Sequence, residues 1–276
     1  MSIRATLIFL ICTFFLAGCE NSDVTLITAA GIDAVKAVSL TDEDVVQLAR
    51  ESSRTLDSQQ QIAPAGNRYA ERLDRLTREY RQLEELEFNY RVYISDTANA
   101  FAMADGTIRI YSQLMDMLDD DELRFVIGHE VGHVVKQHIK KKIRLAYAAQ
   151  AIRKGVASQG NEAGAIAASR IGGFVESLLG AQFSQLEEKE ADDYGLSFLE
   201  SRGHDPAAAI RALNKLAALG SDHTFLSSHP DPAARAVRLR KQLAGLDVSI
   251  DQKKQGMVDW LKNLYEKAAI QVRRFI

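Results

Sequence analysis

Apolar residues recur at three- and four-residue spacing in two N-terminal segments, and this spacing predicts amphipathic helices. The first segment spans residues 41–61, where Thr41 or Asp42 is placed to cap the helix start. The second segment spans residues 69–86. Residues 63–67 lie between the two and contain proline and glycine, so we expect two separate helices.

The period then changes to two, which is typical of half-buried strands. Residues 88–94 alternate between apolar and polar side chains, and two further runs, 99–103 and 107–111, flank Asp105-Gly106. Asp-Gly is a favoured hairpin turn, so we expect these runs to form a small, mainly antiparallel sheet.

Helical spacing returns near residue 119 and continues along the rest of the chain. After the helix that begins there, the expected helices span 144–158, 163–180, 183–202, 206–219, 231–244 and 255–274. These elements predict a predominantly helical α+β fold, with the sheet packed beside the helix that begins at residue 119.

That helix is bounded by charge: acidic residues 119–122 stand at its start, and basic residues gather at 136–144. Apolar side chains cover nearly its whole circumference, at Leu123, Phe125, Val126, Ile127, Val131, Val134 and Val135. Such a helix is buried on most sides. It nevertheless contains His129, Glu130 and His133, and buried ionisable groups need partners that a metal ion can supply.

His129-Glu130-Val131-Gly132-His133 is an H-E-x-x-H motif. At about 100° per residue, His129 and His133 point about 40° apart, so both imidazoles can reach one ion. Glu130 lies within about 60° of His133, near enough to take a proton from an attacking water.

His138 is the nearest candidate for a third ligand, and we do not expect it to serve. A continuous helix places it about 140° around the axis from His133, so the two cannot share an ion. We expect His138 to be a surface residue at the helix end.

The third ligand can instead be a carboxylate from a second helix, and residues 187–193 contain several carboxylates. Glu188 and Asp192 are one turn apart and share a helix face. Glu188 can then ligate the metal while Asp192 accepts a hydrogen bond from a ligand histidine. By spacing alone, three other carboxylates compete with them: Glu187, Glu190 and Asp193.

The N-terminal stretch predicts a targeting signal. Arg4 precedes an apolar run at 7–17, and Leu16-Ala17-Gly18-Cys19 resembles the lipobox of bacterial lipoproteins, in which the cysteine becomes the acylated terminus. A plain secretory signal cleaved at the same small residues is the alternative. Residue 20 is Glu rather than the Asp that retains such lipoproteins at the inner membrane. We therefore expect a lipid anchor in the outer membrane, facing the periplasm.

Composition excludes two classes of function. The chain has 276 residues and two cysteines, Cys12 inside the signal and Cys19 at the lipobox. Cleavage therefore leaves no thiol for cysteine-protease chemistry or for cysteine-ligated zinc. The formal net charge is −3, and no basic stripe with interleaved aromatic residues is present, so we expect no nucleic-acid partner.

Motifs within residues 85–240 resemble the HtpX-type and CAAX-prenyl-protease-type zinc metalloendopeptidases, which are gluzincins. They occur in that family's order: Asn99-Ala100-Phe101, Gly128–His133, Glu188-x-x-Ala191-Asp192 and His229-Pro230. The resemblance implies a gluzincin-like metalloprotease core, with Glu188 as the third ligand and Asp192 as the partner of His129. Membrane-embedded members carry transmembrane helices around the site, and this chain is more similar to the soluble periplasmic branch.

The resemblance also places His229 near the zinc, where it can cap the open coordination position or stabilise the oxyanion. The residues alone also allow a surface loop histidine there. Arg235 matches a family position and is implied to hold this loop. The strand Asn99-Ala100-Phe101 resembles the edge strand that holds an extended substrate backbone in gluzincins.

Together these features predict a zinc metalloendopeptidase with one Zn²⁺ per chain and Glu130 as general base. Expected partners are unfolded or misfolded envelope proteins as substrates, the membrane surface through the lipid anchor, and an envelope protein. The alternative is a zinc-stabilised, non-proteolytic chaperone or assembly factor for outer-membrane proteins, although a structural site needs no base. The expected organisation is a signal at 1–18, a lipidated tether at 19–40, the protease domain at 41–245 and an amphipathic C-terminal helix at 246–276.

Overall fold

The computed structural model describes residues 40–146, 178, 180–220 and 224–245. The expected signal, Cys19, most of the tether, the helices expected within 147–177 and the C-terminal helix lie outside the described residues. The expected domain boundaries therefore stay predictions.

The first expected helix is present as α3 (Asp42–Gln59), which a capping box between Thr41 and Asp44 begins. The second is shorter than expected: α4 spans Arg68–Thr77, and a 3₁₀ turn continues it to Tyr80. Two short antiparallel strands follow, β1 (Gln82–Leu83) and β2 (Leu86–Glu87).

The turn between β1 and β2 explains why the helix expected to reach residue 86 ends early. Glu84 and Glu85 both have positive φ, at 50° and 66°. Two such residues in succession are typical of a tight hairpin turn, and the hairpin outweighs the helical propensity of the glutamates.

The main sheet is mixed rather than mainly antiparallel. Its strands are β3 (Asn89–Tyr93), β4 (Ala100–Ala102) and β5 (Thr107–Tyr111), in the order β3-β5-β4. The hairpin between β4 and β5 is antiparallel as expected, but β3 pairs with β5 in parallel. The expectation was wrong for β3 because the buried strand β5 takes the central position, and the chain after β3 crosses to the far edge before turning back.

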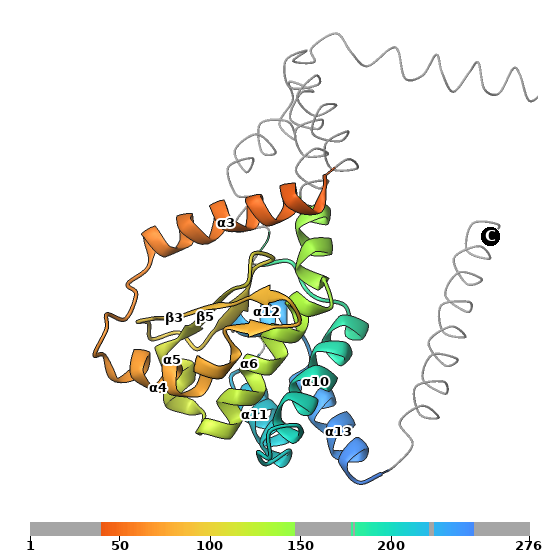
Figure 1. Ribbon diagram of the computed structural model, residues 1–276. Coiled ribbons are helices and arrows are strands. Elements are labelled where there is room, and N and C mark those ends of the chain that lie inside the picture. The colour runs from red at the N-terminus through yellow and green to blue at the C-terminus, as the bar shows by residue number, and fades with distance from the viewer. Residues whose placement is uncertain (1–39, 147–177, 179, 221–223, 246–276) are drawn as a thin grey trace, which may run out of the picture.

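The sheet is covered on two sides (Figure 1). The helix α3 crosses one side, while α4, α5 (Ser112–Met117) and α6 (Asp120–Val135) lie on the other. Arg109 on β5 is almost fully buried, and its Nε and Nη2 donate to the two carboxylate oxygens of Asp57 on α3 at 2.8 and 2.9 Å. This paired charge ties α3 to the central strand.

Helices form the second half of the described fold, which confirms the predominantly helical α+β prediction. They are α10 (Gln185–Glu200), α11 (Ala207–Ala217), the short α12 (Thr224–Ser228) and α13 (Pro232–Leu243). No helix among the described residues is long and apolar enough to cross a bilayer.

Glycines bring α6 and α10 into close contact. A Cβ added at Gly195 of α10 would lie 3.0 Å from the Phe125 carbonyl oxygen and 3.1 Å from the His129 amide nitrogen of α6. On α6, a Cβ at Gly128 would lie 2.9 Å from the Phe198 side chain, and one at Gly132 would lie 2.9 Å from the Tyr194 side chain. Because these glycines carry no side chains, the two backbones approach closely enough for residues of both helices to meet.

Replacing Gly195 with alanine is expected to lower the free energy of unfolding by about 1–3 kcal/mol, because the new methyl group meets backbone atoms that cannot rotate aside. Alanine's better helix propensity offsets about 1 kcal/mol of this loss. Urea denaturation measures the net change. Gly180→Ala is the matched control, because a Cβ there meets nothing within 4 Å. A Gly195 variant that is more stable than the wild type, as helix propensity alone would predict, would contradict the close-packing argument.

Candidate metal centre

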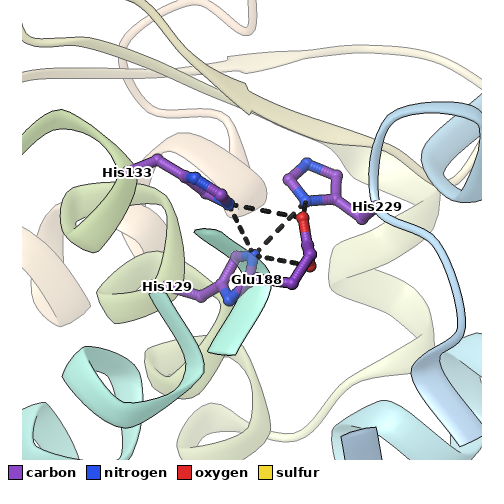
Figure 2. A group of neighbouring side chains, drawn as sticks. All are labelled: His129, His133, Glu188 and His229. Atoms are coloured by element: carbon purple, nitrogen blue, oxygen red, sulfur yellow. Dashed lines mark hydrogen bonds and ion pairs between the residues drawn. The ribbon is translucent and has the colours of Figure 1, made fainter. Parts of the chain in front are cut away.

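Three elements bring four potential metal ligands together (Figure 2). His129 and His133 project from α6, Glu188 projects from α10, and His229 follows α12. Their ligand atoms all lie within 4.8 Å of one another, and all four side chains are buried. The three expected ligands thus converge, and His229 is a buried residue of the site rather than a surface loop histidine.

The spacing of these atoms fits a tetrahedral ion. The two Nε2 atoms of His129 and His133 are 3.1 Å apart, and each lies 3.6 Å from an oxygen of Glu188. Nδ1 of His229 lies 3.3 Å from His129 Nε2 and 3.0 Å from Glu188 Oε1. Ligands of a tetrahedral zinc ion are separated by about 3.3 Å.

The proton positions also favour a cation between the two histidines. His129 Nδ1 lies 3.1 Å from Asp192 Oδ1, and an ionised carboxylate only accepts hydrogen bonds. His129 therefore carries its proton on Nδ1 and presents a bare Nε2 to the site. Burial lowers the pKa of His133 well below its ordinary value, which favours the neutral, ligating form.

Arg235 on α13 contacts two buried carboxylates of α10, those of Glu188 and Asp192. Its Nη2 and Nε donate to Asp192 at 2.7 and 3.0 Å, and its Nη1 contacts Glu188 Oε2. Burial is the largest effect and raises the pKa of each carboxyl, but Arg235 and the neighbouring histidines together outweigh it and keep both pKa values below their ordinary range. Asp192 thus takes the position expected for the partner of His129. Arg235 contacts the acidic helix rather than only its own loop.

Glu130 lies beside the ligand cluster of His129, His133, Glu188 and His229 and is not part of it. Its side chain is 1% exposed, and its Oε1 has no hydrogen-bond partner among the described residues. The nearest ionisable contact is His229 Nε2, at 3.5 Å. A buried carboxylate oxygen with an unused lone pair, next to a metal-ligand cluster, is suited to accept a proton from water.

A cavity of about 340 Å³ opens onto this group. Glu130 and His229 line it together with residues 99–103, which include the expected substrate strand Asn99-Ala100-Phe101. The amide of Tyr111 donates to the Asn99 carbonyl, and the amide of Met103 donates to the Thr107 carbonyl. The alternate residues Ala100 and Ala102 therefore direct their backbone groups away from β5, toward the free edge of the sheet.

His138 is buried, so the expected surface position was wrong. Its Nδ1 lies 3.0 Å from His133 Nδ1, on the side opposite the ligand cluster, and its Nε2 lies 2.8 Å from Glu190 Oε2. The helix does not continue as assumed: α6 ends at Val135, and Gln137 adopts a positive φ of 61° before a new helix begins at residue 138. His138 is still outside the ligand cluster, as expected.

The structure separates the competing carboxylates of residues 187–193. Glu187 caps the start of α10 and pairs with Lys141 at 2.7 Å. Asp193 pairs with Arg238 at 2.6 Å, and Glu190 contacts His138. Of this acidic run, only Glu188 reaches the ligand cluster.

Sequence reasoning missed two residues that surround the site. The Phe183 ring stacks on His133 with centroids 3.8 Å apart, and the Lys142 ammonium lies 4.1 Å above the Phe183 centroid. Lys142 also lines the cavity, where burial lowers the pKa of its amine to about 8. Neither residue belongs to a motif, so no spacing pattern pointed to them.

Comparison with known proteins agrees with this geometry. The family model for peptidase family M48 matches residues 65–243. Metalloprotease LoiP of Escherichia coli (strain K12) is 39% identical over 247 residues, covering 88% of this chain and 98% of LoiP. Metalloprotease YcaL of the same strain is 32% identical over 235 residues, covering 83% of this chain and 92% of YcaL. The mitochondrial metalloendopeptidase OMA1 of Arabidopsis thaliana is 33% identical over 159 residues, covering 56% of this chain and 31% of OMA1.

The resemblance inferred from the motifs is confirmed at the level of the family, because the matched region contains both helices of the ligand cluster and His229. The chain belongs to peptidase family M48 and is a metal-dependent peptidase.

Proposed function

We propose that this protein is a zinc-dependent endopeptidase that cleaves extended or misfolded polypeptides in the cell envelope. The observation that carries the proposal is the buried cluster of His129, His133 and Glu188. Beside it lies Glu130 Oε1, which has no hydrogen-bond partner among the described residues. A structural metal site needs no such base, and this difference favours hydrolysis over a chaperone role alone.

His129, His133 and Glu188 would hold the metal, which is the two-histidine, one-carboxylate donor set of catalytic zinc. A zinc ion held there would supply Lewis-acid chemistry and would lower the pKa of water at the site toward neutrality. Asp192 keeps the proton of His129 on Nδ1, and Arg235 keeps Glu188 ionised and in place.

Glu130 is the general base of the proposed reaction. It takes a proton from the attacking water and later delivers a proton to the leaving amine. His229 Nε2 lies 3.5 Å from Glu130 Oε1, so its imidazole borders the place where the scissile carbonyl would enter. A protonated His229 nitrogen is suited to donate a hydrogen bond to the developing oxyanion.

The free edge of β4 supports an extended substrate. Ala100 and Ala102 direct backbone groups into the mouth of the cavity, where a peptide strand can add to the sheet. The Ala100 amide is bonded to its neighbour Asn99 Oδ1 at 2.9 Å, a local contact that a substrate carbonyl can replace. Folded surfaces rarely present a free strand, which favours unfolded or misfolded chains as substrates.

The proposed location rests on the sequence. The lipobox at residues 16–19 and Glu20 support a lipid anchor at Cys19 in the outer membrane, on its periplasmic face. There the protein would meet misfolded envelope proteins, and an envelope protein partner is part of the same proposal. Several acyl chains hold a protein stably on a membrane surface.

Glu130→Gln is expected to lower kcat for cleavage of unfolded casein by about 100- to 10,000-fold while zinc stays bound, because the variant loses the base but no ligand. Peptide release with zinc supplied measures this loss. Glu200→Gln removes a carboxylate at the far end of α10 and serves as the control. Equal, negligible cleavage by wild type and variant, with equal suppression of substrate aggregation, would favour the chaperone role.

Glu188→Ala is expected to reduce bound zinc to well below one ion per chain, because the carboxylate ligand is gone. Glu187→Ala should retain full zinc, since that carboxylate caps α10 and lies outside the ligand cluster. Elemental analysis of the purified proteins gives the stoichiometry. Full zinc in Glu188→Ala together with loss in Glu187→Ala would show that the third ligand is assigned wrongly.

Cys19→Ala is expected to move the protein out of the membrane fraction and to abolish palmitate labelling, because the acylated residue is missing. Cell fractionation with labelled palmitate tests both effects. A plain secretory signal predicts instead that wild type and variant are equally soluble and unlabelled.

A further inference from the structure

The turn after α6 places His138 behind a metal ligand. Gln137 has a left-handed backbone at φ 61°, a conformation that is unfavourable for a residue other than glycine. Its amide donates to the Val134 carbonyl at 2.9 Å, so the chain folds back on the end of the helix. His138, the next residue, then lies beside His133 instead of farther along the axis.

The hydrogen bonds among His133, His138 and Glu190 determine which ring nitrogen of each histidine carries its proton. As a ligand, His133 uses Nε2, which lies 3.1 Å from His129 Nε2, so its single proton is on Nδ1. That Nδ1–H donates to His138 Nδ1 at 3.0 Å, which must therefore accept. The proton of His138 is then on Nε2, which donates to Glu190 Oε2 at 2.8 Å.

The two ligand histidines of α6 therefore have different outer partners. His129 donates directly to Asp192, a buried carboxylate that also accepts from Arg235. His133 reaches a carboxylate only through His138, and that carboxylate, Glu190, is 44% exposed at the surface. The outer partner of a ligand histidine normally fixes its tautomer and ring orientation.

We propose that His138 and Glu190 are positioning residues that hold His133 in its metal-binding tautomer and thereby raise the affinity of the site for zinc. The proposal rests on the proposed function only in requiring that His133 binds the metal. It does not depend on the peptidase reaction. We call the hydrogen-bonded series His133–His138–Glu190 the relay. Phe183 adds to it by stacking on the His133 ring, so both the face and the outer nitrogen of that imidazole are in contact.

His138→Leu is expected to weaken zinc binding by about 10- to 100-fold, because the His133 Nδ1–H loses its acceptor. His138→Asn should stay within a few-fold of wild type, since its Oδ1 occupies nearly the place of Nδ1 and can accept the same hydrogen bond. Glu190→Gln should cause a smaller loss than His138→Leu, because an amide oxygen still accepts from His138. Glu200→Gln, on the same helix, should leave zinc binding unchanged.

Competition between the full-length protein and a zinc chelator measures these dissociation constants. Circular dichroism of the metal-free proteins identifies any variant that does not fold, and such a variant is then left out of the comparison. Glu190→Leu removes the partly exposed acceptor of His138 and keeps the test decisive if His138→Leu does not fold. Wild-type affinity in folded His138→Leu or in Glu190→Leu would overturn the proposal.

Nitrogen NMR of the zinc-loaded wild type tests the relay without any substitution. The expected spectrum has protonated Nε2 and unprotonated Nδ1 on His138, and protonated Nδ1 on His133. A His138 protonated on Nδ1 would overturn the proposal, because it could not accept from His133. A wild type that binds no zinc would instead overturn the proposed function, whereas zinc-dependent cleavage with unchanged affinity in the relay variants would overturn the relay alone.

Discussion

The close packing of α6 against α10 is the constraint on which the site depends. His129 and His133 are one turn apart on α6, and Glu188 and Asp192 are one turn apart on α10. Two such pairs meet only if the helix backbones come nearer than ordinary side chains allow. Glycines at the contact permit that approach, and the 3.6 Å separation between His133 Nε2 on α6 and Glu188 Oε1 on α10 follows from it.

The negative charge of buried carboxylates is the second constraint on the site. Glu130, Glu188 and Asp192 are almost fully buried, and Arg235 is the cation in closest contact with two of them. Arg238 also reaches Asp192, at 3.4 Å, but it pairs more closely with Asp193. Glu130 Oε1 has no hydrogen-bond partner among the described residues, and incompletely paired buried charge is costly. A metal cation held by the ligand cluster would add positive charge beside these carboxylates, so the electrostatics and the geometry both favour a metal site there.

Sequence periodicity predicted the elements that local interactions determine. The apolar spacing of α6 and the alternation of β5 are properties of a few consecutive residues, and both elements were placed correctly. The convergence of His129, His133 and Glu188 also agrees with the motif spacing, although choosing Glu188 over Glu190 required the family resemblance.

The failures have a common physical origin. The left-handed residues Glu84, Glu85 and Gln137 are of types that normally favour helices, and only tertiary packing holds them in turns. Each of these turns ended a helix that periodicity continued. The parallel pairing of β3 with β5 is likewise a long-range choice that strand alternation does not encode. His138 was misplaced because the angle calculated for it assumed an unbroken helix.

Helix α3 supports the sheet edge at which substrate binding is proposed, although α3 lies on another side of the sheet. Phe101 on β4 pairs with Arg109 on β5, and the guanidinium of Arg109 is fixed by both oxygens of Asp57. A hairpin of this length has little stability alone, so its register depends on what anchors the inner strand. Because β4 forms one wall of the cavity and Glu130 another, a shift of β5 would move the bound peptide relative to the base. Helix α3, which begins next to the expected membrane tether, is thus linked through Asp57 and Arg109 to the edge where substrate would bind.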